Sequence, residues 1–259
     1  MVQSGRLEYA QAKLEPFAID QMTHSIGTPP KRAILIPKML PTVTYTLIIA
    51  NKAYSSWSLR PWLLMRHFGI AFDEVVVPLG RAETRAEILR YSPAARCPVL
   101  RDGDRTVWDS LAIIEYVAEA FPDRAVWPRD PAARARARAL SAEMHSGFMA
   151  LRSHLPTNFR RQVGERPLTP EAAADVARIE EAFSSAREEF GAGGTFLFGE
   201  FSAADAMFAP VVNRLHIYAV AVAPQTRAYM DAVMALPAWR DWRDGAFAEP
   251  WTIEKYEIV

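Results

Sequence analysis

Hydrophobic and polar positions follow a regular order from Val43 onward, and this order predicts the first structural elements. Short apolar runs predict strands over Tyr45–Ala50 and Phe72–Val77. Between and after these strands, apolar residues recur at helical spacing over about Trp57–His67 and Thr84–Tyr91. The resulting order of strand, helix, strand and helix predicts an α/β unit.

Two more short strands and a helix follow this unit. The strands are predicted over Val99–Arg101 and Arg105–Trp108, and the pair Asp102-Gly103 between them is typical of a tight hairpin turn. A helix with one apolar face then begins at Asp109-Ser110, with Ser110 as its expected cap, and ends before Pro122. Residues 43–121 are therefore predicted to form one α/β domain.

The rest of the chain has only helical patterns. Residues 122–130 contain two prolines among charged residues, which predicts a linker. Helices are predicted over about 130–154, 170–191, 203–216, 225–235 and 238–245. The first two are opened by a capping residue and a proline, Asp130-Pro131 and Thr169-Pro170. Residues 131–259 are therefore predicted to form an all-helical domain.

Residues 1–42 lack these patterns. They contain five prolines and only short apolar runs, so we expect a poorly ordered N-terminal extension. Charged residues throughout the first thirty positions also leave no room for the apolar segment of a secretory signal. Met39 lies just before the first strand and is an alternative natural start.

Composition argues against several classes of partner. Lys plus Arg and Asp plus Glu both number 30, so no net charge attracts nucleic acid. The longest uncharged apolar run, Leu215–Pro224, is too short to cross a bilayer. Cys97 is the only cysteine, which excludes an internal disulfide, and the histidines show no metal-ligand spacing. We therefore expect a cytoplasmic protein that binds no metal, nucleic acid or membrane.

A hydroxyl-rich turn between the first strand and the first helix is the main candidate for chemistry. It reads Tyr54-Ser55-Ser56-Trp57-Ser58-Leu59-Arg60 and is called the serine turn below. Any of its three serines can cap the helix, but capping explains only one of them. Hydroxyls and the unpaired N–H groups of a helix N-terminus can together hold an anion. The serine turn is therefore a candidate anion site.

Three motifs resemble the cytosolic glutathione transferase family, and the resemblance covers about residues 44–245. Ser55-Ser56-Trp57-Ser58-Leu59-Arg60 resembles the Ser-Ser-Cys-Ser-Trp-Arg turn of the zeta class, with Trp57 in place of cysteine. Arg96-Cys97-Pro98-Val99-Leu100 resembles the Val-Pro segment whose proline is cis in this family, with Cys97 in place of valine. Asp109-Ser110 matches the acidic residue and serine that start the third helix.

The resemblance implies a fold and a set of glutathione contacts. The fold would be a thioredoxin-like N-terminal domain followed by an all-helical C-terminal domain, with glutathione as co-substrate and a small electrophile as second substrate. Ser55 would activate the glutathione thiol, with Ser56 and Ser58 as the alternatives. Ser55 is preferred because it precedes the helix, where capping explains it less well than the serines nearer the helix. The residues that would bind glutathione are Cys97, Pro98, Asp109 and Ser110.

The same resemblance implies a second-substrate pocket and an oligomer. The pocket would be formed by Trp57, Arg60, His145, Phe148 and Arg152. His145 is also a candidate general base, although a histidine beside Met144 and Phe148 is more typical of a structural role. Cys97 is disfavoured as a redox thiol, because Ser55 lies where a redox class has its cysteine. The family pairs its two domains across subunits, which implies a homodimer.

Three functions are consistent with these residues. The first is conjugation of glutathione to a small electrophile, with a serine hydroxyl that stabilises the thiolate. The second is glutathione-dependent cis–trans isomerisation of a maleylacetoacetate-type diacid, the reaction of the zeta class, for which Arg60 and Arg152 would be cationic anchors. The third is a non-catalytic glutathione-binding module. Intact Ser55, Pro98 and Ser110 favour an enzyme over the third function.

Overall fold

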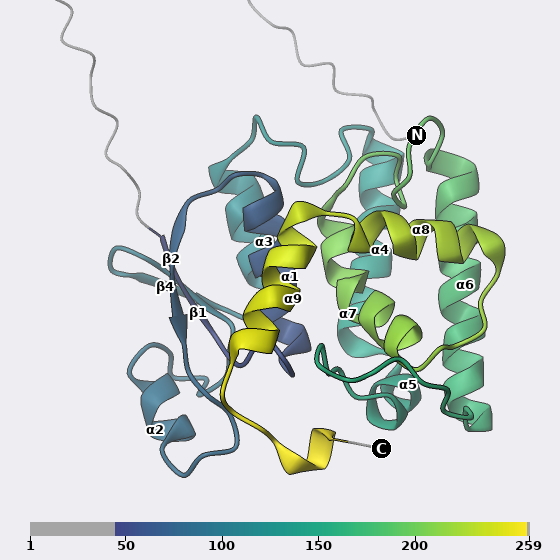
Figure 1. The fold of residues 1–259 in the computed structure, drawn as a ribbon. Helices are drawn as coiled ribbons and strands as arrows, with labels where there is room; N and C mark the ends of the chain where they lie inside the picture. The colour runs from purple at the N-terminus through teal and green to yellow at the C-terminus, as the bar shows by residue number, and fades with distance from the viewer. Residues whose placement is uncertain (1–44, 258–259) are drawn as a thin grey trace, which may run out of the picture. The chain divides into compact units, whose positions relative to one another are not determined.

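The computed structural model describes residues 45–257 (Figure 1), so the predictions for residues 1–42 lie outside the described residues. Its first seven elements are β1 (Tyr45–Ile49), α1 (Ser56–His67), β2 (Phe72–Val76), α2 (Thr84–Leu89), β3 (Val99–Asp102), β4 (Arg105–Trp108) and α3 (Ser110–Ala120). The predicted order of elements is confirmed, with small differences at their ends.

The four strands form one sheet in the order β2-β1-β3-β4. β1 pairs in parallel with β2, where Ile48 lies opposite Val75, and antiparallel with β3, where Ile48 lies opposite Val99. β3 and β4 form the predicted antiparallel hairpin. α1 is the crossover between the parallel strands, which need a long connection. A βαβ unit followed by a ββα unit is the thioredoxin-like fold.

Alternate residues of β1 enter two different cores. Leu47 and Ile49 belong to the large core that includes buried residues of α1 and α3. Ile48 points to the opposite face, where it packs with Val99 of β3 and Ile88 of α2. Successive side chains of a strand point to opposite faces, so a strand covered on both sides needs a nearly continuous apolar run. The apolar run of β1 is thus explained by the burial of both its faces.

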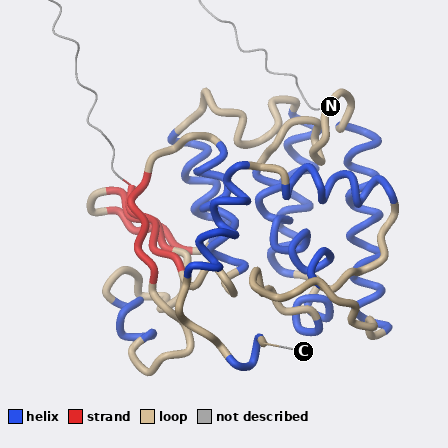
Figure 2. The backbone as a smooth tube through the Cα atoms, in the orientation of Figure 1, coloured by secondary structure: helices blue, strands red, loops and turns tan. Residues whose placement is uncertain are grey.

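The second half of the described chain is helical, as predicted. It contains α4 (Pro131–Ser146), α5 (Met149–His154), α6 (Pro170–Phe190), α7 (Ala203–Ile217), α8 (Pro224–Met234), α9 (Pro237–Ala248) and the 3-10 helix η1 (Glu254–Tyr256). Figure 2 shows the strands gathered on one side of the described chain and helices over most of the rest. α7 packs against both α1 and α4, and almost all of its residues are buried. None of the helices within residues 45–257 is long and apolar enough to cross a membrane.

The helix predicted over 130–154 is interrupted in the structure. Gly147 ends α4, and Phe148 adopts left-handed backbone angles (φ 57°, ψ 41°) before α5 begins. This conformation is unfavourable for a residue with a side chain, but the ring of Phe148 is buried near Phe208 of α7, with 6.5 Å between ring centroids. The prediction of one continuous helix was therefore wrong, because Gly147 ends α4 and the left-handed backbone of Phe148, whose ring is buried against α7, separates α4 from α5.

Residues 249–257, called the C-terminal segment below, return to the thioredoxin-like domain. The Glu249 carboxylate accepts hydrogen bonds from the backbone N–H groups of Lys52 (2.6 Å) and Ala53 (3.1 Å). Further along, the Tyr54 hydroxyl contacts the side chains of Glu257 and Arg160. The C-terminal segment thus holds the backbone just before the serine turn, and no sequence pattern predicts this return.

Candidate active site

The serine turn lies between β1 and α1, and its first serine caps the helix. Ser55 has extended backbone angles, and its Oγ accepts a hydrogen bond from the backbone N–H of Ser58 at 3.2 Å. The Ser55 hydroxyl also donates to Ser58 Oγ at 2.8 Å, and that oxygen accepts from the N–H of Ala50 at 3.0 Å. The premise that Ser55 has little structural role was therefore wrong, because Ser55 is the helix cap.

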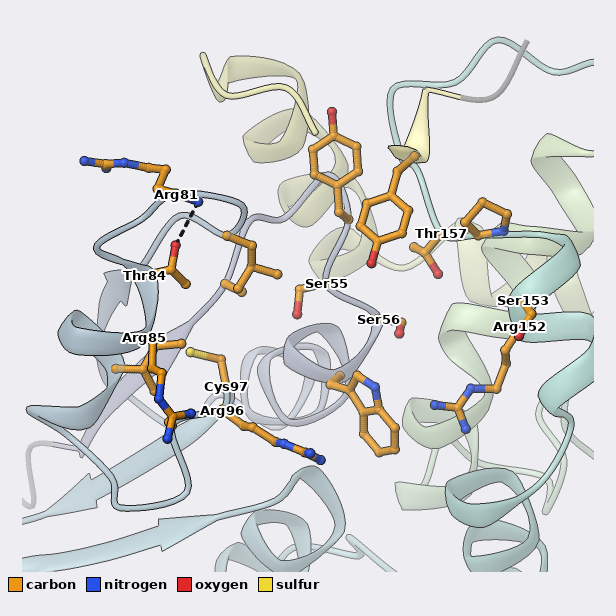
Figure 3. A pocket seen from close by; sticks show the side chains of 18 of the residues that line it. Ser55, Ser56, Arg81, Thr84, Arg85, Arg96, Cys97, Arg152, Ser153 and Thr157 are labelled. Carbon is orange, nitrogen blue, oxygen red and sulfur yellow. Dashed lines mark hydrogen bonds between the residues drawn. The ribbon is translucent and has the colours of Figure 1, made fainter. Parts of the chain in front are cut away.

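Ser56, the first residue of α1, has a different environment. Its hydroxyl has no hydrogen-bond partner among the residues that the structure describes. Ser55 and Ser56 both line the same cavity, as Figure 3 shows. Two hydroxyls therefore face one cavity at a helix N-terminus, where a negative charge is favoured.

This cavity has a volume of about 600 Å³ and is formed between the two domains. The thioredoxin-like wall includes the serine turn and residues around α2, whereas the helical wall comes from α5, α7, the residues after α5 and the C-terminal segment. Figure 3 shows Ser55 and Ser56 with Arg81, Arg85 and Arg96 on one side of them and Arg152 on the other.

All the charged side chains that line the cavity are cationic. Its charged lining residues are Arg81, Arg85, Arg96, Arg152 and Arg214, and none of the lining residues is Asp or Glu. Within residues 45–257, no group of three or more His, Cys, Asp or Glu side chains could hold a metal ion. The cavity is therefore suited to organic anions.

A second cavity of about 540 Å³ adjoins the first and shares Trp57, Arg96 and Cys97 with it. Pro98 also lines it, and the Cys97–Pro98 peptide bond is cis, as the family resemblance implied. Burial raises the pKa of the Cys97 thiol to about 12. Because the thiolate is the reactive form, this thiol is inert near neutral pH, in line with the preference against redox chemistry at Cys97.

The start of α3 forms another part of the second cavity. Asp109 has φ 76° and is the cap of α3, because its carboxylate accepts from the backbone N–H of Leu111 at 2.8 Å. Ser110 is the first helical residue, so the prediction that it caps the helix was wrong. The Ser110 hydroxyl is buried and accepts a long hydrogen bond of 3.4 Å from Arg60 Nη1. An acceptor-rich ligand can reach the N-terminus of α3 through this cavity.

Trp57 lines both cavities and is flanked by two arginines. The guanidinium carbon of Arg60 lies 4.4 Å from its ring centroid, and that of Arg152 lies 4.8 Å away. His145 packs edge-on against the same ring, with 5.0 Å between centroids, and its Nε2 lies 3.3 Å from an Asp109 carboxylate oxygen. These contacts join α4 and α5 to the start of α1 and of α3.

The structure separates the five residues predicted to form the second-substrate pocket. Trp57 and Arg152 line the larger cavity, whereas Arg60, His145 and Phe148 line neither cavity. Arg60 and His145 contact Trp57, and Phe148 faces the core. A direct substrate role for these three residues stays a prediction.

Arg214, a buried arginine of α7, was not among the predicted site residues. Its Nε donates to the carbonyl of Leu155 (2.8 Å) and its Nη1 to the carbonyl of Pro210 (3.3 Å). Burial, together with the charge of Arg152, lowers the pKa of Arg214 to about 9. One signal was present in the sequence, because a charge inside an apolar helix needs a partner or a ligand.

Two family models match this chain, one in each domain. The glutathione S-transferase N-terminal domain matches residues 54–120, and the glutathione S-transferase C-terminal domain matches residues 169–245. The first match contains the serine turn, the cis-proline segment and the start of α3, and the second contains α7.

Individual relatives agree with these matches. A probable maleylacetoacetate isomerase of Caenorhabditis elegans is 34% identical over 96 residues, which span 37% of this chain and 44% of that protein. The maleylacetoacetate isomerase of Rattus norvegicus is 28% identical over 191 residues, 71% of this chain and 85% of that protein. The structure of a glutathione transferase homolog from Burkholderia gl BGR1, with bound glutathione, has a TM-score of 0.61 and 24% identity, covering 80% of this chain and 100% of that chain. This structural similarity shows the shared fold.

Proposed function

Because the chain belongs to the glutathione transferase family, we propose that it binds glutathione and conjugates the glutathione thiol to a small electrophile. The observation that carries this proposal is the pair of hydroxyls of Ser55 and Ser56, which face a large cavity at the N-terminus of α1. The sulfur of glutathione would lie beside these hydroxyls, and one of them would donate a hydrogen bond to the thiolate.

The adjoining cavity would hold the remainder of glutathione. Cys97 and Pro98 line it just before β3, where backbone groups can bind an extended peptide. The γ-glutamyl carboxylate would lie at Ser110, where the N-terminus of α3 favours an anion. Since the two cavities share Trp57, one ligand can reach both.

The serine turn has to make a thiolate available near neutral pH. A free thiol has a pKa of about 8.5, and each unit of lowering requires about 1.4 kcal/mol of preferential thiolate stabilisation. A hydrogen bond to a charged group contributes about 1.5 to 3 kcal/mol, and the dipole of α1 acts in the same direction. One serine hydroxyl at this helix is therefore sufficient for a shift of about one to two units.

Ser55 is the first candidate for the donor, and Ser56 is the alternative. To donate to sulfur, the Ser55 hydroxyl must rotate away from Ser58 Oγ, while its oxygen keeps the hydrogen bond from the Ser58 N–H. The Ser56 hydroxyl has no hydrogen bond within the described part of the chain, so it can donate to sulfur without breaking one. The geometry thus makes the two serines closer rivals than the sequence alone suggested.

The thiolate absorbance of the glutathione complex, measured against pH, tests this proposal. Replacing the donating serine, Ser55→Ala or Ser56→Ala, should raise the pKa of bound glutathione by about one to two units and slow conjugation near neutral pH. Ser153→Ala is the matched control, because Ser153 lines the opposite wall of the same cavity. Serine activation is refuted if neither variant moves the titration.

A second candidate reaction is the isomerisation of maleylacetoacetate, the substrate in the names of two relatives. Arg152 and Arg214 on the helical wall favour it, because a diacid needs cationic anchors. A panel containing aryl halides, peroxides and maleylacetoacetate separates conjugation from isomerisation. Tight glutathione binding without turnover on any of them would select the non-catalytic binding module instead.

Assembly and location complete the proposal. We propose the homodimer that the family resemblance implies, in which the thioredoxin-like domain of one subunit packs against the helical domain of the other. Sedimentation at micromolar concentration should give a dimer, and a monomer there would contradict the proposal. Location in the cytoplasm stays a prediction from the sequence.

A further inference from the structure

Charge is distributed unevenly around the larger cavity. Five arginines line it, and no Asp or Glu does, although the whole chain has equal numbers of basic and acidic residues. Arg81 has a partner in Glu83 at 3.7 Å. Among residues 45–257, the other four arginines of the cavity form no salt bridge. A cavity with uncompensated cations attracts anions.

Arg152 and Arg214 are held in place by main-chain carbonyl oxygens. Arg152 Nη1 donates to the carbonyls of His145 (3.3 Å) and Gly147 (3.4 Å), which lie where α4 ends. Arg214 donates through Nε and Nη1 to two carbonyls, and its Nη2 has no hydrogen-bond partner among the described residues. Carbonyl groups orient a guanidinium without neutralising it. Both charges therefore stay available to a ligand.

A third group on the same wall lacks a partner. Thr157 lines the cavity, is only 3% exposed, and its Oγ1 has no hydrogen-bond partner within the described part of the chain. A buried hydroxyl without a partner is costly, as is a buried cation without an anion. Burial lowers the pKa of both Arg152 and Arg214, because removal from water disfavours their charged forms. A bound carboxylate would lower the cost at all three residues.

Glutathione also has carboxylates. The five arginines of the cavity must therefore be assigned, some to glutathione and the others to the second substrate. Arg81, Arg85 and Arg96 belong to the thioredoxin-like domain, on the same side of the serines as Cys97 (Figure 3). Arg152 belongs to α5 and lies on the opposite side, and Arg214 belongs to α7. The first three arginines are thus the natural partners of glutathione, which leaves the helical wall for the second substrate.

We infer that the helical wall is a carboxylate site, in which Arg214 and Arg152 hold an anionic group of the second substrate and Thr157 adds a hydrogen bond. The inference rests on the proposed function, because it assigns the substrate class of that same cavity. Preferred substrates are electrophiles that carry a carboxylate, such as aromatic or unsaturated acids. Arg60, which donates to Ser110 and lines neither cavity, is not part of this site.

Binding of two glutathione conjugates tests the inference without requiring turnover. S-(4-carboxybenzyl)glutathione and S-(4-carbamoylbenzyl)glutathione differ only in the charge of the group that would reach the helical wall. Calorimetric titration of the wild-type protein should give at least about tenfold tighter binding of the carboxylate conjugate. In Arg214→Gln this preference should fall below about twofold, while affinity for glutathione itself stays unchanged.

Controls separate the possible outcomes. Arg240→Gln removes the same charge from an exposed position of α9 and should keep the preference. If Arg214→Gln fails to fold, the wild-type preference and its loss in Arg152→Gln decide the question. Equal binding of the two conjugates by the wild type would overturn this inference and leave the proposed function intact. An equal loss of affinity for glutathione and for both conjugates in Arg214→Gln would do the same. Failure of the wild type to bind glutathione would instead overturn the proposed function and this inference with it.

Discussion

The two walls of the larger cavity hold their polar groups by different means. On the thioredoxin-like wall, Ser55 and Ser58 bond to each other across one helical turn, and Ser58 reaches back to Ala50 at the end of β1. On the helical wall, Arg214 of α7 is fixed by the carbonyl of Leu155, which follows α5 and lies 59 residues away in sequence. The first wall is therefore built by local contacts and the second by the packing of distant helices.

This difference separates two properties of the proposed enzyme. The serine turn would determine the pKa of the glutathione thiol, and its geometry depends on few residues. The helical wall would determine which electrophile binds, and its charges depend on how α5 and α7 pack. Changes in helix packing can therefore alter substrate choice while the thiolate site stays intact.

The largest effect is expected from breaking the start of α7, which carries Arg214. The fully buried carboxylate of Asp205 accepts hydrogen bonds from the N–H groups of Leu197 (3.1 Å) and Ser202 (2.8 Å), and from the Ser202 hydroxyl (3.0 Å). Asp205→Ala leaves these buried donors unpaired and should lower the free energy of unfolding by about 3 kcal/mol or more. Urea denaturation measures the change.

Asp241→Ala, at an exposed position of α9, is the matched control and should change stability by less than about 0.5 kcal/mol. Similar stability of Asp205→Ala and the wild type would show that the helical wall does not depend on these hydrogen bonds of Asp205.

A smaller effect is expected at Glu249, a long-range support of the thioredoxin-like wall. Glu249→Ala removes the acceptor for the N–H groups of Lys52 and Ala53 and should cost about 2 kcal/mol of unfolding free energy. Amide hydrogen exchange at Lys52 and Ala53 should accelerate, whereas Glu254→Ala, an exposed change in η1, should leave it unchanged. Unaltered exchange in Glu249→Ala would mean that the Glu249 carboxylate does not hold the backbone before the serine turn.

Ser110→Ala should change glutathione affinity more than turnover. The variant removes a hydroxyl at the N-terminus of α3, so affinity for glutathione should fall by about tenfold, the equivalent of about 1.5 kcal/mol for a hydrogen bond to a carboxylate. The rate at saturating glutathione should stay nearly constant, because Ser110 lines the second cavity, whereas the sulfur is proposed to lie in the first. Titration calorimetry and steady-state kinetics measure the two quantities. Equal losses in both would indicate damage to α3 rather than loss of a ligand contact.

The smallest effect is expected at Cys97. With a folded pKa of about 12, only about one thiol in ten thousand is ionised at pH 8. Alkylation by iodoacetamide should therefore be slow, and its rate should rise about tenfold per pH unit without levelling off near pH 8.5, where a free thiol would. Cys97→Ala should keep conjugation activity within about twofold. Rapid labelling at neutral pH would reopen a redox role for this thiol.

The same contrast explains which features could be predicted from the sequence. The turn, the hairpin and the helix starts depend on neighbouring residues, so motifs such as Asp102-Gly103 and Thr169-Pro170 located them correctly. The cis bond before Pro98 was expected from the family resemblance rather than from local chemistry. Within the serine turn, the prediction that capping explains Ser55 less well than the other serines was wrong. A shift of one residue in the start of α1 decides which serine is the cap.

Features that depend on tertiary packing could not be predicted. The break at Phe148 is fixed by burial against α7, and the apolar spacing of the segment continues through it. The charge of Arg214 inside an apolar helix was a signal, but its main-chain carbonyl partners, which leave no mark in the sequence, could not be predicted. The return of the C-terminal segment likewise depends on backbone N–H groups, which every residue except proline has.

The contact between Glu249 and Lys52 joins a residue that is synthesised early to one that is synthesised near the end of the chain. The two residues are 197 positions apart, so the ribosome releases the serine turn long before its partner exists. Local strand and helix contacts can form early, but a contact of this separation closes late. A nascent chain that has folded its sheet still has unpaired N–H groups ahead of Ser55. The backbone before the serine turn therefore gains this support only after α9 and Glu249 have been synthesised.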